Sequence, residues 1–260
     1  MLISLTSSSG SPGVSTTALG LALAWPRDVI LLEADTLGVS STLAGFFAGS
    51  ISPQSTVIDL TPGQDFEEKL LEQSIPLTDD TEPLRRLVPG ISNPLQGRAL
   101  SSRWDALAMA LYDLERAGID VLVDIGRFYA PFMAAPILKI SDVTALVLQP
   151  TVTATVAAKS TITHRRLAES GDIEAPALHL ITIDAPDTYS ESEASRALGQ
   201  PSLGSLPWAP KHAAAFAHGR PRPRGFDSSS YIRSLRSLAD SISTAARKRR
   251  AAIQNLRGDA

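Results

Sequence analysis

A short glycine-rich loop near the start of the chain has the residue types and spacing that bind phosphate. Residues 5–25 are LTSSSGSPGVSTTALGLALAW, a loop of small residues between an apolar strand pattern and a helical pattern. Consecutive backbone N–H groups at such a helix start form a nest for an anion, and glycine lets the backbone approach that anion closely. A hydroxyl at the start of the helix can bind magnesium. The sequence therefore predicts a phosphate site formed by Gly10, Ser11, Gly13, Val14, Ser15 and Thr16, with Ser15 as a magnesium ligand.

The loop lacks the lysine that normally accompanies this chemistry. In the pattern G-x-x-x-x-G-K-[ST], Gly13 takes the second glycine position, which puts Ser8 at the first glycine and Val14 at the lysine. Glycine-rich turns also occur without any ligand. A turn that binds nothing is therefore the alternative interpretation of this loop.

Two aspartates follow apolar strand patterns at places where a magnesium phosphate site needs carboxylates. Asp35 ends VILLEAD (residues 29–35), and Asp124 ends VLVD within residues 119–126. We expect Asp124 to hold magnesium together with Ser15, and Asp35 to position an attacking water, which are roles that carboxylates take in phosphoryl transfer. An aspartate at a strand end can also simply cap a turn. The carboxyl ends of parallel strands share one edge of a sheet, so both catalytic candidates should lie beside the loop.

Apolar strand patterns alternate with helical patterns along most of the chain. Strand patterns cover residues 2–6, 29–35, 84–90, 119–126, 143–150, 177–183 and 202–208, and helical patterns cover residues 16–24, 65–73, 102–117, 191–198 and 211–218. Several of the strand patterns are almost continuously apolar, which is typical of strands covered on both faces. The alternation predicts an α/β fold with a doubly wound, mainly parallel sheet and helices on both faces.

The C-terminal residues, 227–260, are interpreted as a separate helical segment that follows a domain spanning residues 1–226. A helix is expected over residues 228–256, with an apolar stripe at helical spacing that consists of Tyr231, Ile232, Leu235, Leu238, Ala239 and Ile242. We expect this stripe to pack on the domain, and attachment to an anionic membrane surface is the alternative. The basic run is either solvated or a contact for DNA or an anionic membrane, and it consists of Arg247, Lys248, Arg249 and Arg250.

The composition limits the classes of protein that fit. The 260 residues are 43% hydrophobic and 20% charged, which is ordinary for a globular chain with a large core. A formal net charge of −3 argues against a general nucleic-acid footprint. The absence of cysteine excludes disulfides, thiolate catalysis and cysteine-bound metals. No leader pattern and no uncharged run of membrane-spanning length is evident, so we expect a cytoplasmic protein, with peripheral attachment to membrane or nucleoid left open.

Taken in this order, the motifs resemble the ParA/MinD family of deviant-Walker P-loop ATPases. SGSPGVSTTALGLALAW is similar to the family's K-G-G-x-G-K-T-T loop and helix, and VILLEADTLGVSSTLAGFF is similar to its D-x-D strand. IDVLVDIG resembles its Walker B strand, LVLQPTVTATVAAKSTI the strand and helix after switch II, and ALGQPSLGSLPWAPKHAAAFAHGRP its late segment. The likeness extends over about residues 1–222. It implies a P-loop NTPase-like fold, ATP or ADP with magnesium as cofactor, and a homodimer with nucleotide between the subunits.

The chain departs from the family pattern at the positions that carry its chemistry. The family's signature lysine falls at Ser9 and the ordinary loop lysine at Val14, while Glu33 takes the first acidic position of D-x-D. The asparagine that contacts adenine in the family is missing from residues 182–184. A charge-assisted hydrogen bond is worth about 1.5–3 kcal/mol, whereas cationic stabilisation of a transferring phosphoryl group is worth about 10³–10⁵ in rate. Loss of both lysines should therefore weaken nucleotide binding, and it should impair or abolish hydrolysis.

Three functions remain open on the sequence alone. The first is a degenerate ParA/MinD-like protein, with weak or absent ATPase activity, that positions or recruits a protein partner in partitioning, division-site or pilus and secretion assembly. The second is an active ATPase whose missing cation comes from Arg127, directly after the Walker B strand, or from a partner. The third is a binding scaffold with no nucleotide cofactor, which contacts DNA or a membrane through its basic C-terminus.

Overall fold

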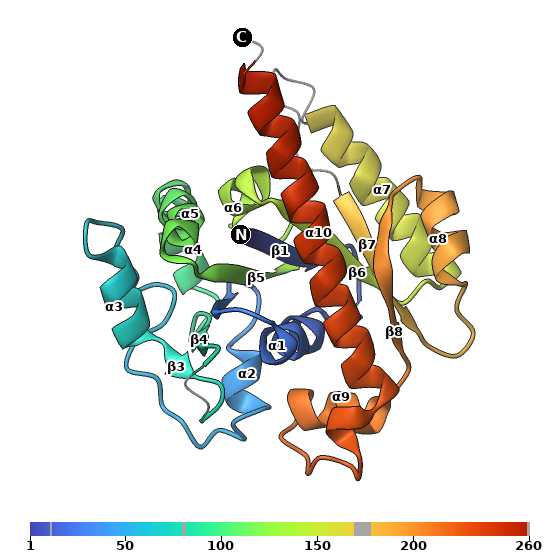
Figure 1. Cartoon of the computed structure of the whole chain (residues 1–260), viewed down its shortest axis with the longest axis horizontal. Helices are drawn as coiled ribbons and strands as arrows, with labels where there is room; N and C mark the ends of the chain where they lie inside the picture. The colour runs from blue at the N-terminus through green and yellow to red at the C-terminus, as the bar shows by residue number, and fades with distance from the viewer. Residues whose placement is uncertain (11, 80–81, 169–177, 259–260) are drawn as a thin grey trace.

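One mainly parallel sheet organises the chain. The computed structural model describes residues 1–10, 12–79, 82–168 and 178–258. Within these residues eight strands pair in the order β3-β4-β2-β5-β1-β6-β7-β8, and every pair is parallel except β3 with β4 (Figure 1). The strands are β1 (Leu2–Ser7), β2 (Val29–Glu33), β3 (Ile75–Pro76), β4 (Arg85–Val88), β5 (Asp120–Arg127), β6 (Val143–Leu148), β7 (Leu178–Asp184) and β8 (Ser202–Pro207). The predicted mainly parallel sheet is confirmed.

Helices cover both faces of the sheet, which confirms the doubly wound architecture. They are α1 (Val14–Ala24), α2 (Ser41–Ala44), α3 (Phe66–Gln73), α4 (Gln96–Ser101), α5 (Trp104–Asp113), α6 (Ala135–Ile140), α7 (Val152–Ala168), α8 (Glu191–Leu198), α9 (Pro210–Ala217) and α10 (Ser230–Gly258), with 3-10 turns η1 (Leu114–Ala117) and η2 (Phe226–Ser228). The helices α1, α9 and α10 pack on one face, and α5 to α8 pack on the other (Figure 1).

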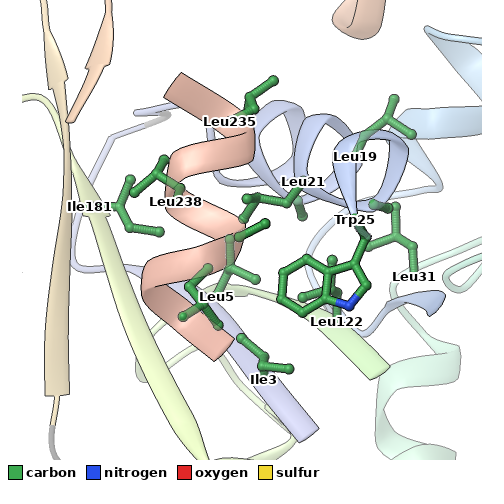
Figure 2. Close-up of a cluster of buried hydrophobic side chains, with 14 of the residues drawn as sticks. Ile3, Leu5, Leu19, Leu21, Trp25, Leu31, Leu122, Ile181, Leu235 and Leu238 are labelled. Atoms are coloured by element: carbon green, nitrogen blue, oxygen red, sulfur yellow. The ribbon is translucent and has the colours of Figure 1, made fainter. Parts of the chain in front are cut away.

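The larger core lies between the sheet, α1 and α10. Figure 2 shows Leu5 and Leu122 of the central strands together with Leu238 of α10 in this core. The helix α1 approaches α10 so closely at Gly20 that a Cβ there would lie 3.0 Å from Leu235. A side chain at position 20 would therefore push the two helices apart.

The apolar stripe of the C-terminal helix is part of this core. All six stripe residues are at most 6% exposed, and α10 packs mainly on β8 and α1. The prediction that the stripe packs on the domain is confirmed, and the alternative that it lies on a membrane surface is wrong because that face is already covered. None of the helices within the described residues combines the length and apolarity needed to cross a membrane.

Arg250 is held in a network at the amino ends of the central strands. Its Nε and one terminal nitrogen each donate at 2.6 Å to the carboxylate of Asp142, which directly precedes β6. The guanidinium also pairs with Glu115 and lies 5.5 Å from the ring centre of Tyr112. Its inclusion in a basic surface for DNA or membrane contact is therefore wrong, because Arg250 anchors α10 to the sheet. Arg247 and Lys248, from the same basic run, are exposed.

The sequence patterns did not predict the shortest elements. The helices α2 and α6 have four and six residues and β3 has two, which is too few to show a period. The helix expected over residues 102–117 is divided into α5 and η1. It ends at Gly118, whose φ of 81° is the left-handed conformation typical of a helix end.

Candidate functional site

The loop between β1 and α1 emerges in the middle of the carboxyl edge of the sheet. β1 pairs with β5 on one side and with β6 on the other, so the ends of both neighbours flank the loop. Gly10 (φ 67°) and Gly13 (φ 101°) adopt left-handed conformations that favour glycine. Gly13 is the N-cap of α1, and glycine has no side chain that could accept a hydrogen bond from the first N–H groups of the helix. The first N–H groups of α1 are therefore left for a ligand, as an anion site requires.

A pocket of about 400 Å³ brings most of the predicted site residues together. Its walls are Gly10 and residues 12–16 of the loop, Asp35, Leu37 and Gly38 after β2, and Gly126 and Arg127 at the end of β5. Six of the predicted site residues therefore line one pocket, namely Gly10, Gly13, Val14, Ser15, Thr16 and Asp35. Ser11 lies outside the described residues. Asp124 is not among the walls of the pocket and lies buried beside Ser15.

The positions aligned with the two family lysines provide no positive charge. Val14 is only 7% exposed and belongs to the core cluster beneath α1. Ser9 lines an adjoining cavity of about 340 Å³ together with Gln149 and Thr151, and this cavity shares Gly10 and Pro12 with the pocket. The hydroxyl of Ser8, at the start of the loop, is buried and has no hydrogen-bond partner among the described residues. The loop therefore offers backbone amides and hydroxyls, but no ammonium group, to an anion.

Asp124 is a buried carboxyl group coupled to the loop. Burial raises its pKa to about 7, against the lowering effect of hydrogen bonds from the Ser15 side chain and from the N–H of Gly126. The Gly126 N–H donates to Oδ1 at 2.9 Å. Repulsion from Glu33 and Asp35 raises the pKa further. Near neutral pH, Asp124 is therefore present in both its protonated and its ionised form, and a bound cation would favour the ionised form.

Asp35 lies at the mouth of the same pocket, held against the end of β5. Its Oδ1 accepts a hydrogen bond from the N–H of Leu37 at 2.8 Å. The register pairs Glu33 of β2 with Asp124 of β5, so Asp35 extends just beyond the buried aspartate. The sheet therefore places the two predicted catalytic carboxylates on adjacent strands at one edge.

Glu33, which takes the first acidic position of the D-x-D pattern, has a structural role. It is 4% exposed, and its carboxylate accepts hydrogen bonds from the N–H of Thr42 at 2.9 Å and the N–H of Gly90 at 3.1 Å. The hydroxyl of Ser41 donates to it at 3.2 Å. These contacts tie α2 and the turn after β4 to the end of β2. Glu33 is thus already satisfied by protein groups.

Arg127 is a pocket residue that the sequence suggested only as an alternative cation. Its Nε donates to the carbonyl of Gly10 at 3.3 Å, so the end of β5 touches the loop directly. The signal for it in the sequence is its place three residues after Asp124, which puts it at the same sheet edge. That position alone does not reveal the direction of the side chain.

A further, more apolar cavity of about 330 Å³ adjoins the pocket of about 400 Å³, which is called the phosphate pocket below. The two share Pro12, Gly13 and Thr16, and the other walls of the apolar cavity include Ile183, Trp208 and Tyr231. Gln149 is an amide side chain in this cavity, where the family's asparagine is missing. The residues present fit the phosphate and magnesium parts of a nucleotide through uncapped amides and the Ser15–Asp124 pair. They do not supply a lysine.

Comparison with solved structures identifies the fold. A cell division ATPase MinD from Pyrococcus furiosus has a TM-score of 0.70 and 18% identity, over 93% of this chain and 98% of that chain. The septum site-determining protein MinD from Pyrococcus horikoshii OT3, complexed with Mg-ADP, has a TM-score of 0.69 and 16% identity, over 95% and 97% of the two chains. A ParA family ATPase from Chlorobium tepidum TLS has a TM-score of 0.65 and 14% identity, over 94% and 97%. No family model and no curated protein matches the sequence. The chain therefore has the fold of MinD- and ParA-type ATPases along nearly its whole length.

Proposed function

We propose that this chain is a degenerate ParA/MinD-like protein that binds a magnesium nucleotide weakly and positions or recruits a partner, with ATPase activity weak or absent. One observation carries the proposal. A single pocket combines the uncapped start of α1 with Asp35 and with Ser15, whose side chain hydrogen-bonds to the buried Asp124 outside the pocket wall, while Val14 occupies the lysine position with its side chain in the core. The arrangement of a phosphate site is thus retained without the two lysines that support hydrolysis.

Binding and turnover should respond differently to the missing lysines. Backbone amides and a helix start hold phosphate without any side-chain charge. Ser15 and Asp124 would hold magnesium, and Asp35 would orient water, with Gly10, Ser11, Gly13, Val14 and Thr16 around the phosphates. Acceleration of phosphoryl transfer depends on positive charge placed where the transition state develops negative charge. Retained binding with lost turnover is the expected consequence, and the solved MinD complexed with Mg-ADP supports ADP or ATP as the ligand.

A homodimer and a protein partner complete the proposal. Large apolar side chains are exposed in the segments that follow the pocket residues of β2 and β5, with Val39 57% exposed after β2 and Tyr129 and Phe132 53% and 46% exposed after β5. Exposed apolar side chains that lie together are typical of an interaction surface, and these three are the candidates for it. A solved MinC:MinD cell division complex from Aquifex aeolicus has the same fold, which supports recruitment of a protein partner. The proposed place of recruitment is the cytoplasm, with peripheral attachment to membrane or nucleoid as the alternative.

An ATPase that works with a substitute cation is the second candidate function. The contact between Arg127 and the carbonyl of Gly10 favours it, because it places a guanidinium at the pocket. The two candidates differ in turnover and agree on binding. Fast, steady phosphate release that disappears both in Asp124→Ala and in Arg127→Ala would favour the second candidate over the first.

Calorimetric titration of the full chain tests the proposed function. We expect Mg-ATP and Mg-ADP to bind with stoichiometry near one per chain, and EDTA to weaken the binding. Ser15→Ala should lose this dependence on magnesium, whereas Ser50→Ala, which removes an exposed hydroxyl from a distant loop, should behave as the wild type. A wild type that binds neither nucleotide would show instead a scaffold that works without a cofactor.

A further inference from the structure

The phosphate pocket contains one cationic side chain among its described walls. Asp35 lines the pocket and Asp124 lies buried beside it, so a polyphosphate would enter a region that already holds two carboxyl groups. Like charges at short range oppose binding. Val14 and Ser9, at the two lysine positions, cannot offset this charge. Arg127 is the cation that the pocket does provide.

Two backbone features fix the position of the Arg127 main chain. β5 continues past its aspartate, because Arg127 pairs with Ser7 of β1 and the N–H of Phe128 donates to the carbonyl of Ser7 at 2.8 Å. Gly126, with a φ of 71°, bends the strand just before this pairing. The Cα of Arg127 is therefore held beside Ser7, at the base of the phosphate loop.

The guanidinium of Arg127 contacts the loop through one nitrogen, and its other N–H groups are available to a ligand. Its Nε bonds to the carbonyl of Gly10, and no carboxylate pairs with it within the described part of the chain. The two terminal nitrogens therefore retain their N–H groups for another acceptor. A planar guanidinium presents these groups as a fork that matches two phosphate oxygens.

We infer that Arg127 is the cationic ligand for the phosphates of a nucleoside di- or triphosphate, and that it takes over from the end of β5 the binding role, but not the catalytic role, of the missing loop lysines. The inference rests on the proposed function, since it requires an anion in this pocket. Affinity should then rise with the number of phosphates, so that ATP and ADP bind more tightly than AMP. The contact with Gly10 also links ligand binding in the loop to the segment after β5, where Tyr129 and Phe132 are exposed.

Calorimetric titration of the full chain with Mg-ADP and with magnesium pyrophosphate tests the role of Arg127. Arg127→Ala should weaken binding by about 10- to 100-fold, the loss expected for one hydrogen-bonded charge. Arg127→Lys should recover part of the affinity, because lysine keeps the charge and loses the fork. Arg116→Ala is the matched control, since its side chain is 86% exposed in η1, near the other end of β5. It should bind as the wild type does.

The outcomes separate this inference from the proposed function. If the wild type binds and Arg127→Ala binds equally well, the role of Arg127 is overturned while the site stands. The same holds if Arg127→Ala melts at a lower temperature yet keeps full affinity, because the arginine would then only brace the loop. If the wild type binds none of Mg-ADP, Mg-ATP and pyrophosphate, the site itself is overturned, and the role of Arg127 falls with it.

Discussion

The carboxylate of Asp35 rests directly against the α-carbon of Gly126. A Cβ at position 126 would lie 2.3 Å from Cγ of Asp35 and 2.5 Å and 2.7 Å from its two oxygens. This contact joins the segment after β2 to the end of β5, the two places from which the candidate carboxylates come. Only a residue without a side chain allows Asp35 to occupy this position at the mouth of the phosphate pocket.

Gly126→Ala should therefore destabilise the protein and weaken binding of a magnesium nucleotide. Alanine in a left-handed conformation costs about 1–2 kcal/mol, and here it must also displace Asp35. Gly118→Ala is the matched control, because Gly118 has a φ of 81° and a Cβ there would meet no atom within 4 Å. In urea denaturation we expect Gly126→Ala to lose at least about 1 kcal/mol more than Gly118→Ala. Equal losses, with binding intact in both, would contradict the tight contact.

Asp124 should make the stability of the protein fall as the pH rises from about 4 to about 7. Burial raises its pKa from 3.8 to about 7, so the folded state holds a proton that the unfolded state releases. The folded state then loses stability between about pH 4 and pH 7, and the loss persists above that range. Asp124→Asn cannot titrate, so it should exceed the wild type in stability by up to about 4 kcal/mol at pH 8 and by much less at pH 5. Denaturation curves at both pH values provide the test, and a difference independent of pH would count against it.

Arg250→Ala should loosen the C-terminal helix from the sheet. The side chain of Arg250 is 19% exposed and that of Asp142 is 3% exposed, so the substitution removes the cation that is hydrogen-bonded to a buried carboxylate and leaves only the more weakly coupled N-terminal amine and Arg249. Removing one partner of a buried pair costs about 3–5 kcal/mol. Arg247→Ala removes the same charge from an exposed position on α10 and should change the unfolding free energy by less than about 0.5 kcal/mol. Similar urea midpoints for the two variants would show that Arg250 is not an anchor.

Phe132→Ser should reduce self-association if the exposed apolar residues after β5 form part of the dimer surface. Phe132 is 46% exposed, and its loss removes apolar area that a partner subunit would cover. Met109→Ser is the control, because it removes an equally exposed apolar side chain, 56% exposed, from α5. Sedimentation velocity in the presence of Mg-ATP should show fewer dimers for Phe132→Ser alone. A dimer fraction that is unchanged in this variant, or lowered equally in both, would place the interface elsewhere.

The sheet could be predicted because its evidence is local. Continuous apolar runs such as residues 143–148 are buried along their whole length, as strands with helices on both faces must be. The stripe on α10 was likewise visible, since six apolar residues at helical spacing mark one face of a helix. The glycines and hydroxyls of the loop indicated a phosphate site for the same reason, and nucleotide binding by that loop stays a prediction.

The contacts that shape the site could not be predicted because they join residues distant in sequence. Arg127 reaches Gly10 over 117 positions, and Arg250 reaches Asp142 over 108. Each contact depends on which strands are neighbours, and the sequence pattern does not specify that order. Glu33 illustrates the same limit. Its place in an acidic motif suggested chemistry, whereas the fold uses its carboxylate to hold the N–H groups of Thr42 and Gly90.

The central claim is that the loop still binds nucleotide after losing the groups that drive hydrolysis. The most direct measurement is to hold the purified full chain at saturating Mg-ATP, count the bound nucleotide by equilibrium dialysis, and follow the formation of ADP over time. We predict about one nucleotide bound per chain, with ADP formed at most slightly faster than in buffer. Fast, steady conversion to ADP, or no bound nucleotide at saturating Mg-ATP, would contradict the account.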